Sequence, residues 1–286
     1  MIARLLLAIA GALALAGCSG PARDWPEPSP ALWEVTGAEG QQGWLFGTIH
    51  SLPRGARWRT EAVDGAFARS SLLVVEIANL GDSSEASAVF ERLATTPGLP
   101  PLSQRVPAED RPALAALLDR AGMDDGAFSE TETWGAALLL AGRVRRNDTG
   151  SGVDRALIAE AARVEGLESF EEQYAVFDRL PPARQARLLT ALAAEADSHA
   201  EDQRVIAWLT GDIAALEREA SVGILADPEL REALQLSRNR AWAGRVAALL
   251  DGGERPFVAV GAAHMWGEEG LPALLAARGY TVRRVQ

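Results

Sequence analysis

The pattern of apolar and polar positions divides the chain into three parts. Short apolar runs bounded by turn-forming residues lie near both ends and are typical of strands. They predict strands at residues 32–36, 44–49, 71–77, 256–260 and 280–285, and short helices at residues 60–69 and 268–278. The first two strands are separated by the turn-rich sequence GAEGQQG, so we expect a hairpin. The run at residues 71–77 is almost continuously apolar, which suits a strand buried on both faces.

The middle of the chain has a different pattern. From about residue 84 to residue 250, Ala, Leu, Glu and Arg recur at helical spacing and prolines punctuate the sequence. This predicts helices at residues 108–121, 132–145, 153–162, 182–196 and 228–250, with a short strand at 166–169. We therefore expect an α/β (α+β) fold, in which a central mixed sheet is built from both chain ends and the helical middle packs on it as a cap.

The N-terminal segment is typical of a bacterial export signal. Arg4 is followed by an apolar stretch that is too short to span a bilayer, which takes about 20 residues. The sequence Leu-Ala-Gly before Cys18 resembles the lipobox of bacterial lipoproteins. In that family the chain is cut before the cysteine, whose thiol is diacylated. We expect a signal peptide at residues 1–17, a lipidated Cys18 with a Pro-rich flexible tether to residue 30, and one domain at residues 31–286. By resemblance to sorted lipoproteins, Ser19 after the cysteine favours the outer membrane, with the domain facing the periplasm.

Composition limits the chemistry further. The formal net charge is −11, which argues against nucleic acid as a partner, because binding phosphates needs a basic excess. A single cysteine excludes a disulfide framework and any Cys-rich metal site. Only three histidines are present, and His199 lies in an acidic segment where we expect it to be solvated.

The other two histidines share a local frame. His50 ends Gly-Thr-Ile-His and His264 ends Gly-Ala-Ala-His, and each motif closes a predicted buried strand. Gly47 and Gly261 would let the backbone turn sharply or approach a ligand closely. Ligands gather at the carboxyl ends of strands in open α/β sheets, so both histidines are candidates for a shared cleft. The alternative for each is a structural histidine that hydrogen-bonds a carbonyl.

Glu76 is the third candidate. It lies among apolar residues in a predicted buried strand, where a carboxylate is costly unless it is paired or bound to a metal. Its role could be to ligate a divalent metal or to activate water as a base. The alternative is a glutamate at the edge or surface of the sheet.

With these residues in view, the chain resembles the TraB/GumN family, which is related to the Tiki proteins. The resemblance covers most of residues 31–286 and rests on the order of several blocks: LWEVTG, GTIH, the strand with Glu76, GVDRAL (152–157), LESFEEQ (167–173), SRNRAWA (237–243) and VGAAHMWGEEGL followed by GY. Tiki members are similar to metal-dependent proteases, and the wider fold group includes erythromycin esterase-like hydrolases and the ChaN-like haem-binding lipoproteins. The resemblance implies that His50, His264 and Glu76 form the metal or catalytic set. It also implies that Glu168 is a second carboxylate and that Arg238 orients it or the substrate.

The sequence thus favours a metal-dependent, peptidase-like hydrolase of the cell envelope, with Mn²⁺, Co²⁺ or Zn²⁺ as the metal and a peptide or small molecule as the substrate. The chain has neither H-E-x-x-H nor G-x-S-x-G, so it is not a conventional zincin or serine hydrolase. Two alternatives stay open. One is a haem- or metal-binding protein with no catalysis. The other is a regulatory lipoprotein with a degenerate site, attached to the membrane through its N-terminal lipid.

Overall fold

The computed structural model describes residues 24–53, 55–144, 152–195 and 198–286. Its centre is a six-stranded mixed sheet with the strand order β4-β3-β5-β2-β1-β6. The strands are β1 (Leu32–Thr36), β2 (Gln42–Thr48), β3 (Leu72–Val75), β4 (Val164–Gly166), β5 (Pro256–Gly261) and β6 (Thr281–Arg284). β1 and β2 form the predicted hairpin, and β2, β5, β3 and β4 run parallel. The predicted fold class is confirmed.

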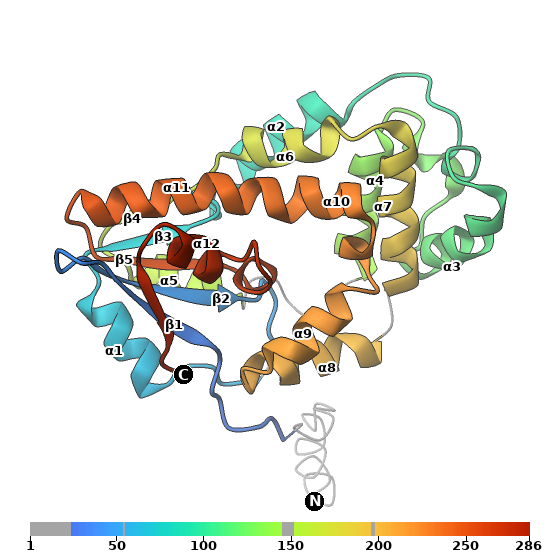
Figure 1. Cartoon of the computed structure of the whole chain (residues 1–286). Helices are drawn as coiled ribbons and strands as arrows, with labels where there is room; N and C mark the ends of the chain where they lie inside the picture. Colours follow the sequence, from blue (N-terminus) through green and yellow to red (C-terminus); the bar gives the residue numbers. More distant parts are fainter. Residues whose placement is uncertain (1–23, 54, 145–151, 196–197) are drawn as a thin grey trace, which may run out of the picture.

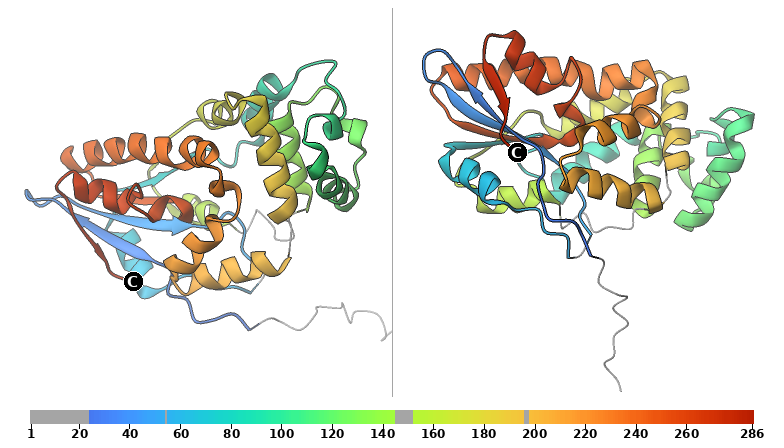
Figure 2. Two further views of the ribbon diagram at one scale, coloured as in Figure 1. Left: turned by 45° about the vertical axis from the view of Figure 1, so that its right-hand side comes forward. Right: turned by 60° about the horizontal axis from the view of Figure 1, so that its bottom comes forward.

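The helices lie in two groups. Those around the sheet are α1 (Glu61–Arg69), α5 (Val153–Glu160), α8 (Ser198–Leu209), α9 (Ile213–Ala220), α11 (Ser237–Asp251) and α12 (Leu271–Ala277). Those of the cap are α2 (Ser83–Ala94), α3 (Arg111–Ala121), α4 (Thr133–Val144), α6 (Phe170–Asp178), α7 (Pro182–Glu195) and α10 (Pro228–Arg231). Figures 1 and 2 show the cap beyond the end of the sheet toward which β2 points.

Strand alternation gives the sheet two apolar faces. On one face, Phe46, Val75 and Phe257 pack against α1, α5 and α8. On the other face, Leu45, Val74 and Val258 pack against α11 and α12. The cap has a separate core made by α3, α4, α7 and α10. The middle of the chain is therefore not only a cap, because α5 and β4 belong to the sheet layer.

The predicted helix at residues 228–250 is interrupted. α10 and α11 follow one another along one line in Figure 1, but residues 232–236 between them form a π-helical turn. Gln235 in this turn is buried and donates a hydrogen bond to the carbonyl of Ala263, in the second G-x-x-H motif. The turn therefore joins the cap core, which contains Leu230, to the sheet core, which contains Trp242, beside that motif.

Two other predicted boundaries need correction. The strand predicted at residues 166–169 is β4 at Val164–Gly166, because Ser169 instead caps α6 through a capping box with Glu172. The helix predicted at 268–278 is only α12, which starts after Gly270. The predicted tether is described from Asp24 on, where it has no regular secondary structure. There Trp25 packs against the sheet core and the Ser29 amide donates to the Leu209 carbonyl.

Two sequence predictions fall outside the described residues, namely the signal peptide and the acylated Cys18. Within the described ranges, no helix combines the length and the apolar character needed to cross a membrane.

Candidate active site

Four neighbouring parallel strands end beside one another, and each is followed by a polar candidate residue. Going along the sheet from β4 through β3 and β5 to β2, these residues are Glu168, Glu76, His264 and His50. Such an edge, made of the carboxyl ends of parallel strands, is where open α/β sheets bind ligands. The structure thus brings all four sequence-predicted side chains to one edge of the sheet, although up to 214 residues separate them in the chain.

Gly261 lies at the centre of this group. A Cβ atom built on it would be 3.1 Å from Glu76 Oε1, 3.7 Å from His264 Cδ2 and 3.8 Å from His50 Nε2. These three groups therefore surround one point that only a glycine leaves open. The φ of Gly261 is −47°, so its role is close approach and not a sharp turn.

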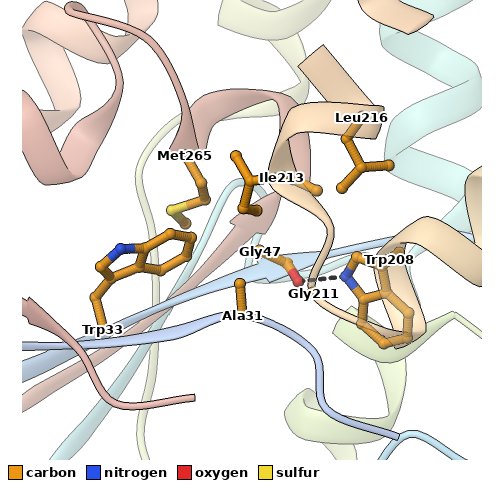
Figure 3. Close-up of a pocket in the computed structure, with 9 residues that line it drawn as sticks. Ala31, Trp33, Gly47, Trp208, Gly211, Ile213, Leu216 and Met265 are labelled. Carbon is orange, nitrogen blue, oxygen red and sulfur yellow. Dashed lines mark hydrogen bonds between the residues drawn. The ribbon is translucent and has the colours of Figure 1, made fainter. Parts of the chain in front are cut away.

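Gly47 has a different role in the same packing. A Cβ on Gly47 would be 3.1 Å from the Cα of Ala262 and 3.3 Å from Met265 Cγ, so this glycine lets the two motifs pack together. Its carbonyl accepts a 2.7 Å hydrogen bond from the indole of Trp208, which Figure 3 shows beside a small apolar pocket. The pocket has a volume of about 10 Å³, room for little more than one water molecule, and it is not the substrate site.

His50 is held by a residue that the sequence did not single out. Its Nδ1 lies 2.5 Å from Oδ2 of Asp154, in the first turn of α5. The Asp154 side chain is 7% exposed, whereas that of His50 is 59% exposed. A carboxylate accepts hydrogen bonds only, so Nδ1 donates, and in the neutral ring Nε2 is then the nitrogen that keeps the lone pair. The exposed Nε2 is thus oriented by a buried anion.

Gly152 lets α5 reach His50. A Cβ on Gly152 would lie 2.6 Å from the backbone oxygen of His50, and the next amide, Val153 N, donates to the Ile49 carbonyl. The GVDRAL block therefore combines a close backbone contact with the carboxylate that orients His50.

Gly152→Ala is expected to push α5 away from His50, because the added methyl group overlaps backbone atoms. We expect a loss of about 1–3 kcal/mol in the free energy of unfolding, measured by urea denaturation, together with loss of the His50–Asp154 contact. The matched control is Gly142→Ala in α4, where a Cβ meets nothing within 4 Å. That variant should be neutral or slightly stabilised. Equal stability of both variants would contradict the close contact.

His264 is arranged in the same way but in a different environment. It is only 5% exposed, and its ring lies 4.5 Å from that of Trp242. Its Nδ1 is 2.5 Å from Oδ1 of Asn239, whose Nδ2 donates to the Glu269 carbonyl. That second bond fixes the amide with its oxygen toward the histidine, so Nδ1 donates and Nε2 keeps its lone pair. Asn239 lies in the SRNRAWA block and, like Asp154, was not predicted from the sequence as a site residue.

Arg238 connects the two carboxylates. Its guanidinium donates to Oε2 of Glu76 at 2.8 Å and to both oxygens of Glu168, one of them from Nε at 3.1 Å. Glu76 also accepts a 2.7 Å bond from the Gly261 amide, and Glu168 accepts one from Gln173. The structure therefore places the Arg238 guanidinium against both carboxylates, and the role that the resemblance implies for it stays a prediction.

Burial and charge set the protonation of the group. Burial would raise the pKa of Glu76, but the positive charges of His264, Arg238 and His50 and the Gly261 amide lower it to about 2. Burial, with Arg238 and His50, lowers the pKa of His264 to about 4 against the attraction of Glu76. Burial raises the pKa of Glu168 against its hydrogen bonds to Arg238. Burial lowers the pKa of Arg238, but the two glutamates outweigh it and raise that pKa. At neutral pH the site therefore holds an ionised Glu76, a charged Arg238 and a neutral His264.

Acidification is expected to destabilise the fold in two steps. Between pH 6.5 and about 4, His264 is protonated in the unfolded chain but not in the folded chain. The free energy of unfolding therefore decreases as the pH is lowered through this range, by about 3 kcal/mol in all. Between pH 4.5 and about 2, Glu76 is protonated in the unfolded chain first and adds a second loss. Urea unfolding at a series of pH values would show the upper step in the native protein and a shallower one in His264→Gln. An unchanged slope in that variant would contradict the assignment.

Two observations complete the site. Within the described ranges, no three His, Cys, Asp or Glu side chains are placed so that they could hold a metal ion together. The side chain of His199 lies outside the described part of the structure, so its predicted solvation stays a prediction.

Comparisons with known proteins add the family. No curated protein and no solved structure matches the chain. The model of the TraB/PrgY/gumN family matches residues 31–284, a span that includes both G-x-x-H motifs and every residue of the site described above. The chain therefore belongs to the TraB/PrgY/gumN family.

Proposed function

We propose that this protein is a peptidase-like hydrolase that uses water to cleave amide or ester bonds. The observation that carries the proposal is the convergence of His50 Nε2, the His264 ring and Glu76 Oε1 within 4 Å of one point at the carboxyl edge of the sheet. His50 is exposed and can reach a substrate, whereas His264 is buried, the Glu76 side chain is only 12% exposed, and both are held by hydrogen bonds. Activation of water requires a base that can reach the water, and His50 is such a base beside the fixed side chains of His264 and Glu76.

The chain's own groups supply the proton transfers. Nε2 of His50 takes a proton from water as the water oxygen bonds to the carbonyl carbon of the substrate. Asp154 holds the ring through Nδ1 and stabilises the imidazolium that forms. The imidazolium then returns the proton to the leaving nitrogen or oxygen as the scissile bond breaks. The ionised Glu76 borders the same point and favours the positive charge on His50.

A divalent metal ion was expected from the sequence, and the donor types suit one. Both imidazoles are anchored through Nδ1 and present Nε2, which is the usual arrangement of metal-binding histidines. The surroundings of these donors do not suit a metal ion, because Arg238 donates to Oε2 of Glu76 and its NH1 group lies 3.5 Å from His264 Nε2. The steps above therefore use only the chain's own groups. The metal-dependent hydrolase with His50, His264 and Glu76 as ligands is the second candidate, favoured by the two Nε2 lone pairs.

The test is turnover of a peptide library followed by mass spectrometry. The purified protein is assayed as isolated, after treatment with a chelator, and after Mn²⁺, Co²⁺ or Zn²⁺ is restored. Cleavage that survives the chelator supports the metal-free reaction, and cleavage restored only by metal supports the second candidate. If neither form cleaves any peptide or model ester, the hydrolase proposal is wrong. A haem titration of the same samples then tests the binding alternative through a Soret shift that is absent in His50→Ala.

The proposed location is the outer membrane, with the domain in the periplasm and Cys18 as the point of lipid attachment. It is supported by the lipobox-like sequence before Cys18 and by Ser19 after it. Labelling of cells with a fatty-acid probe should mark the native protein and not a Cys18→Ser variant.

A further inference from the structure

The guanidinium of Arg238 has no free hydrogen-bond donor. Arginine carries five N–H groups. Nε donates to Glu168, NH2 donates to Glu168 and Glu76, and NH1 donates to the Leu234 carbonyl at 2.9 Å and faces His264 Nε2 at 3.5 Å. Its Cζ atom also lies 4.5 Å from the centre of the Trp242 ring. Arg238 therefore has no donor left for a substrate, and its role lies within the protein.

The surroundings of Arg238 explain why a cation is needed there. The side chains of Glu76 and Glu168 are 12% and 7% exposed, and that of Arg238 is 15% exposed. Two carboxylates at this depth repel each other strongly unless a positive charge lies between them. Every oxygen of both carboxylates accepts a hydrogen bond, from Arg238, the Gly261 amide or Gln173. The guanidinium thus neutralises the carboxylates of Glu76 and Glu168 and fixes their positions.

We propose that Arg238 is the resident cation of this active site: it takes the position that a divalent metal ion would otherwise take against Glu76, Glu168 and His264. The proposal rests on the hydrolase function proposed above. It makes Arg238 a positioning residue that acts through Glu76 and His264 and does not touch the substrate. It also makes the native site a poor binder of divalent ions, because a second cation would lie within a few ångström of the guanidinium.

Removing the guanidinium should convert the site into a metal site. Without it, Glu76 and Glu168 are carboxylates with no cation between them, beside the Nε2 atom of His264, which then no longer faces Arg238. These three side chains supply N and O donors of the kind that Zn²⁺ and Co²⁺ bind, and water can fill the fourth position of a tetrahedral site. In the native structure they are not placed to hold one ion together, so they must move into the space that the guanidinium leaves. A substitution that removes a cation is therefore expected to create affinity for one.

The experiment compares metal binding by the native protein, Arg238→Gln and Arg240→Gln. Arg240 is the matched control, since it is on the same helix but pairs with Glu232 and Glu269 at the surface. Binding of Co²⁺ and Zn²⁺ is followed by calorimetry and by the visible spectrum of bound Co²⁺. We expect Arg238→Gln to bind one ion at least 100-fold more tightly than the native protein and Arg240→Gln, which should resemble each other. Stoichiometric micromolar binding by the native protein, or no gain in Arg238→Gln, would overturn the proposal.

If the Arg238→Gln variant does not fold, a second measurement on the native protein tests the proposal. The melting temperature of the native protein is then measured with and without 1 mM Co²⁺ or Zn²⁺, because a bound ion stabilises the folded state by mass action. No rise in melting temperature supports the proposal, and a large rise overturns it. Neither readout needs turnover. Metal-dependent turnover by a metal-binding native protein would leave the hydrolase function standing without the role of Arg238. An inactive protein that gains a metal in Arg238→Gln would show the opposite.

Discussion

Replacing His50 with alanine is expected to reduce hydrolysis at least 1,000-fold and to leave the stability of the fold almost unchanged. The side chain carries the base of the proposed reaction, but it is 59% exposed, so its removal opens no cavity in the core. Library cleavage rates and urea unfolding of the same preparation measure the two effects.

His264→Ala serves as the comparison, because the two motifs look alike in sequence. His264 is buried against Trp242 and Asn239, so its loss should reduce activity and also destabilise the fold by about 2–4 kcal/mol. Activity near the native level in His50→Ala would rule out His50 as the base. Equal destabilisation by the two substitutions would contradict their different burial.

Asp154→Asn is expected to cost between 100-fold and 10,000-fold in kcat with little change in KM. An asparagine can present either an oxygen or an NH₂ group to His50 and cannot stabilise an imidazolium by charge, so the ring loses its orientation and its proton affinity. The pH dependence of kcat should also change, which a purely structural role for Asp154 would not cause.

The double variant separates a shared function from two independent ones. If Asp154 acts only through His50, Asp154→Asn should have almost no further effect in a His50→Ala background, since residues that act as a unit are not additive. Effects that multiply would contradict the Asp154–His50 pair. Asp64→Asn is a suitable control, because Asp64 is itself 49% exposed and pairs with Arg59, which is not one of the site residues.

The architecture of the sheet could be predicted because its signals are local. The run at residues 71–77 is apolar on both faces, and the structure buries all four residues of β3 between the two sheet cores. The same logic identified Glu76 as a carboxylate that must have a partner. The misplaced β4 had a local signal that the prediction did not use, the Ser169–Glu172 capping box that starts a helix where a strand was expected.

The partners of the two histidines could not be predicted in the same way. Asp154 lies 104 residues after His50, and Asn239 lies 25 residues before His264 on a different element. Nothing in the spacing of either pair indicates contact, because the contacts depend on how α5 and α11 cross the two faces of the sheet. Asp154 and Asn239 do lie in sequence blocks on which the family resemblance rests, GVDRAL and SRNRAWA. These blocks therefore contain site residues that were not among the candidates predicted from the sequence.

The π-helical turn at residues 232–236 makes the site sensitive to chain length. A π-helical turn contains one residue more than the α-helix needs, and each residue rotates an α-helix by about 100°. Deleting one residue between Leu230 and Arg238 would restore a regular helix while turning its two halves relative to each other. Leu230 could then stay in the cap core only if Arg238 left the carboxylates. The π-helical turn thus sets the rotation of α11 relative to α10, so that side chains of one helical segment pack into both the cap core and the sheet core.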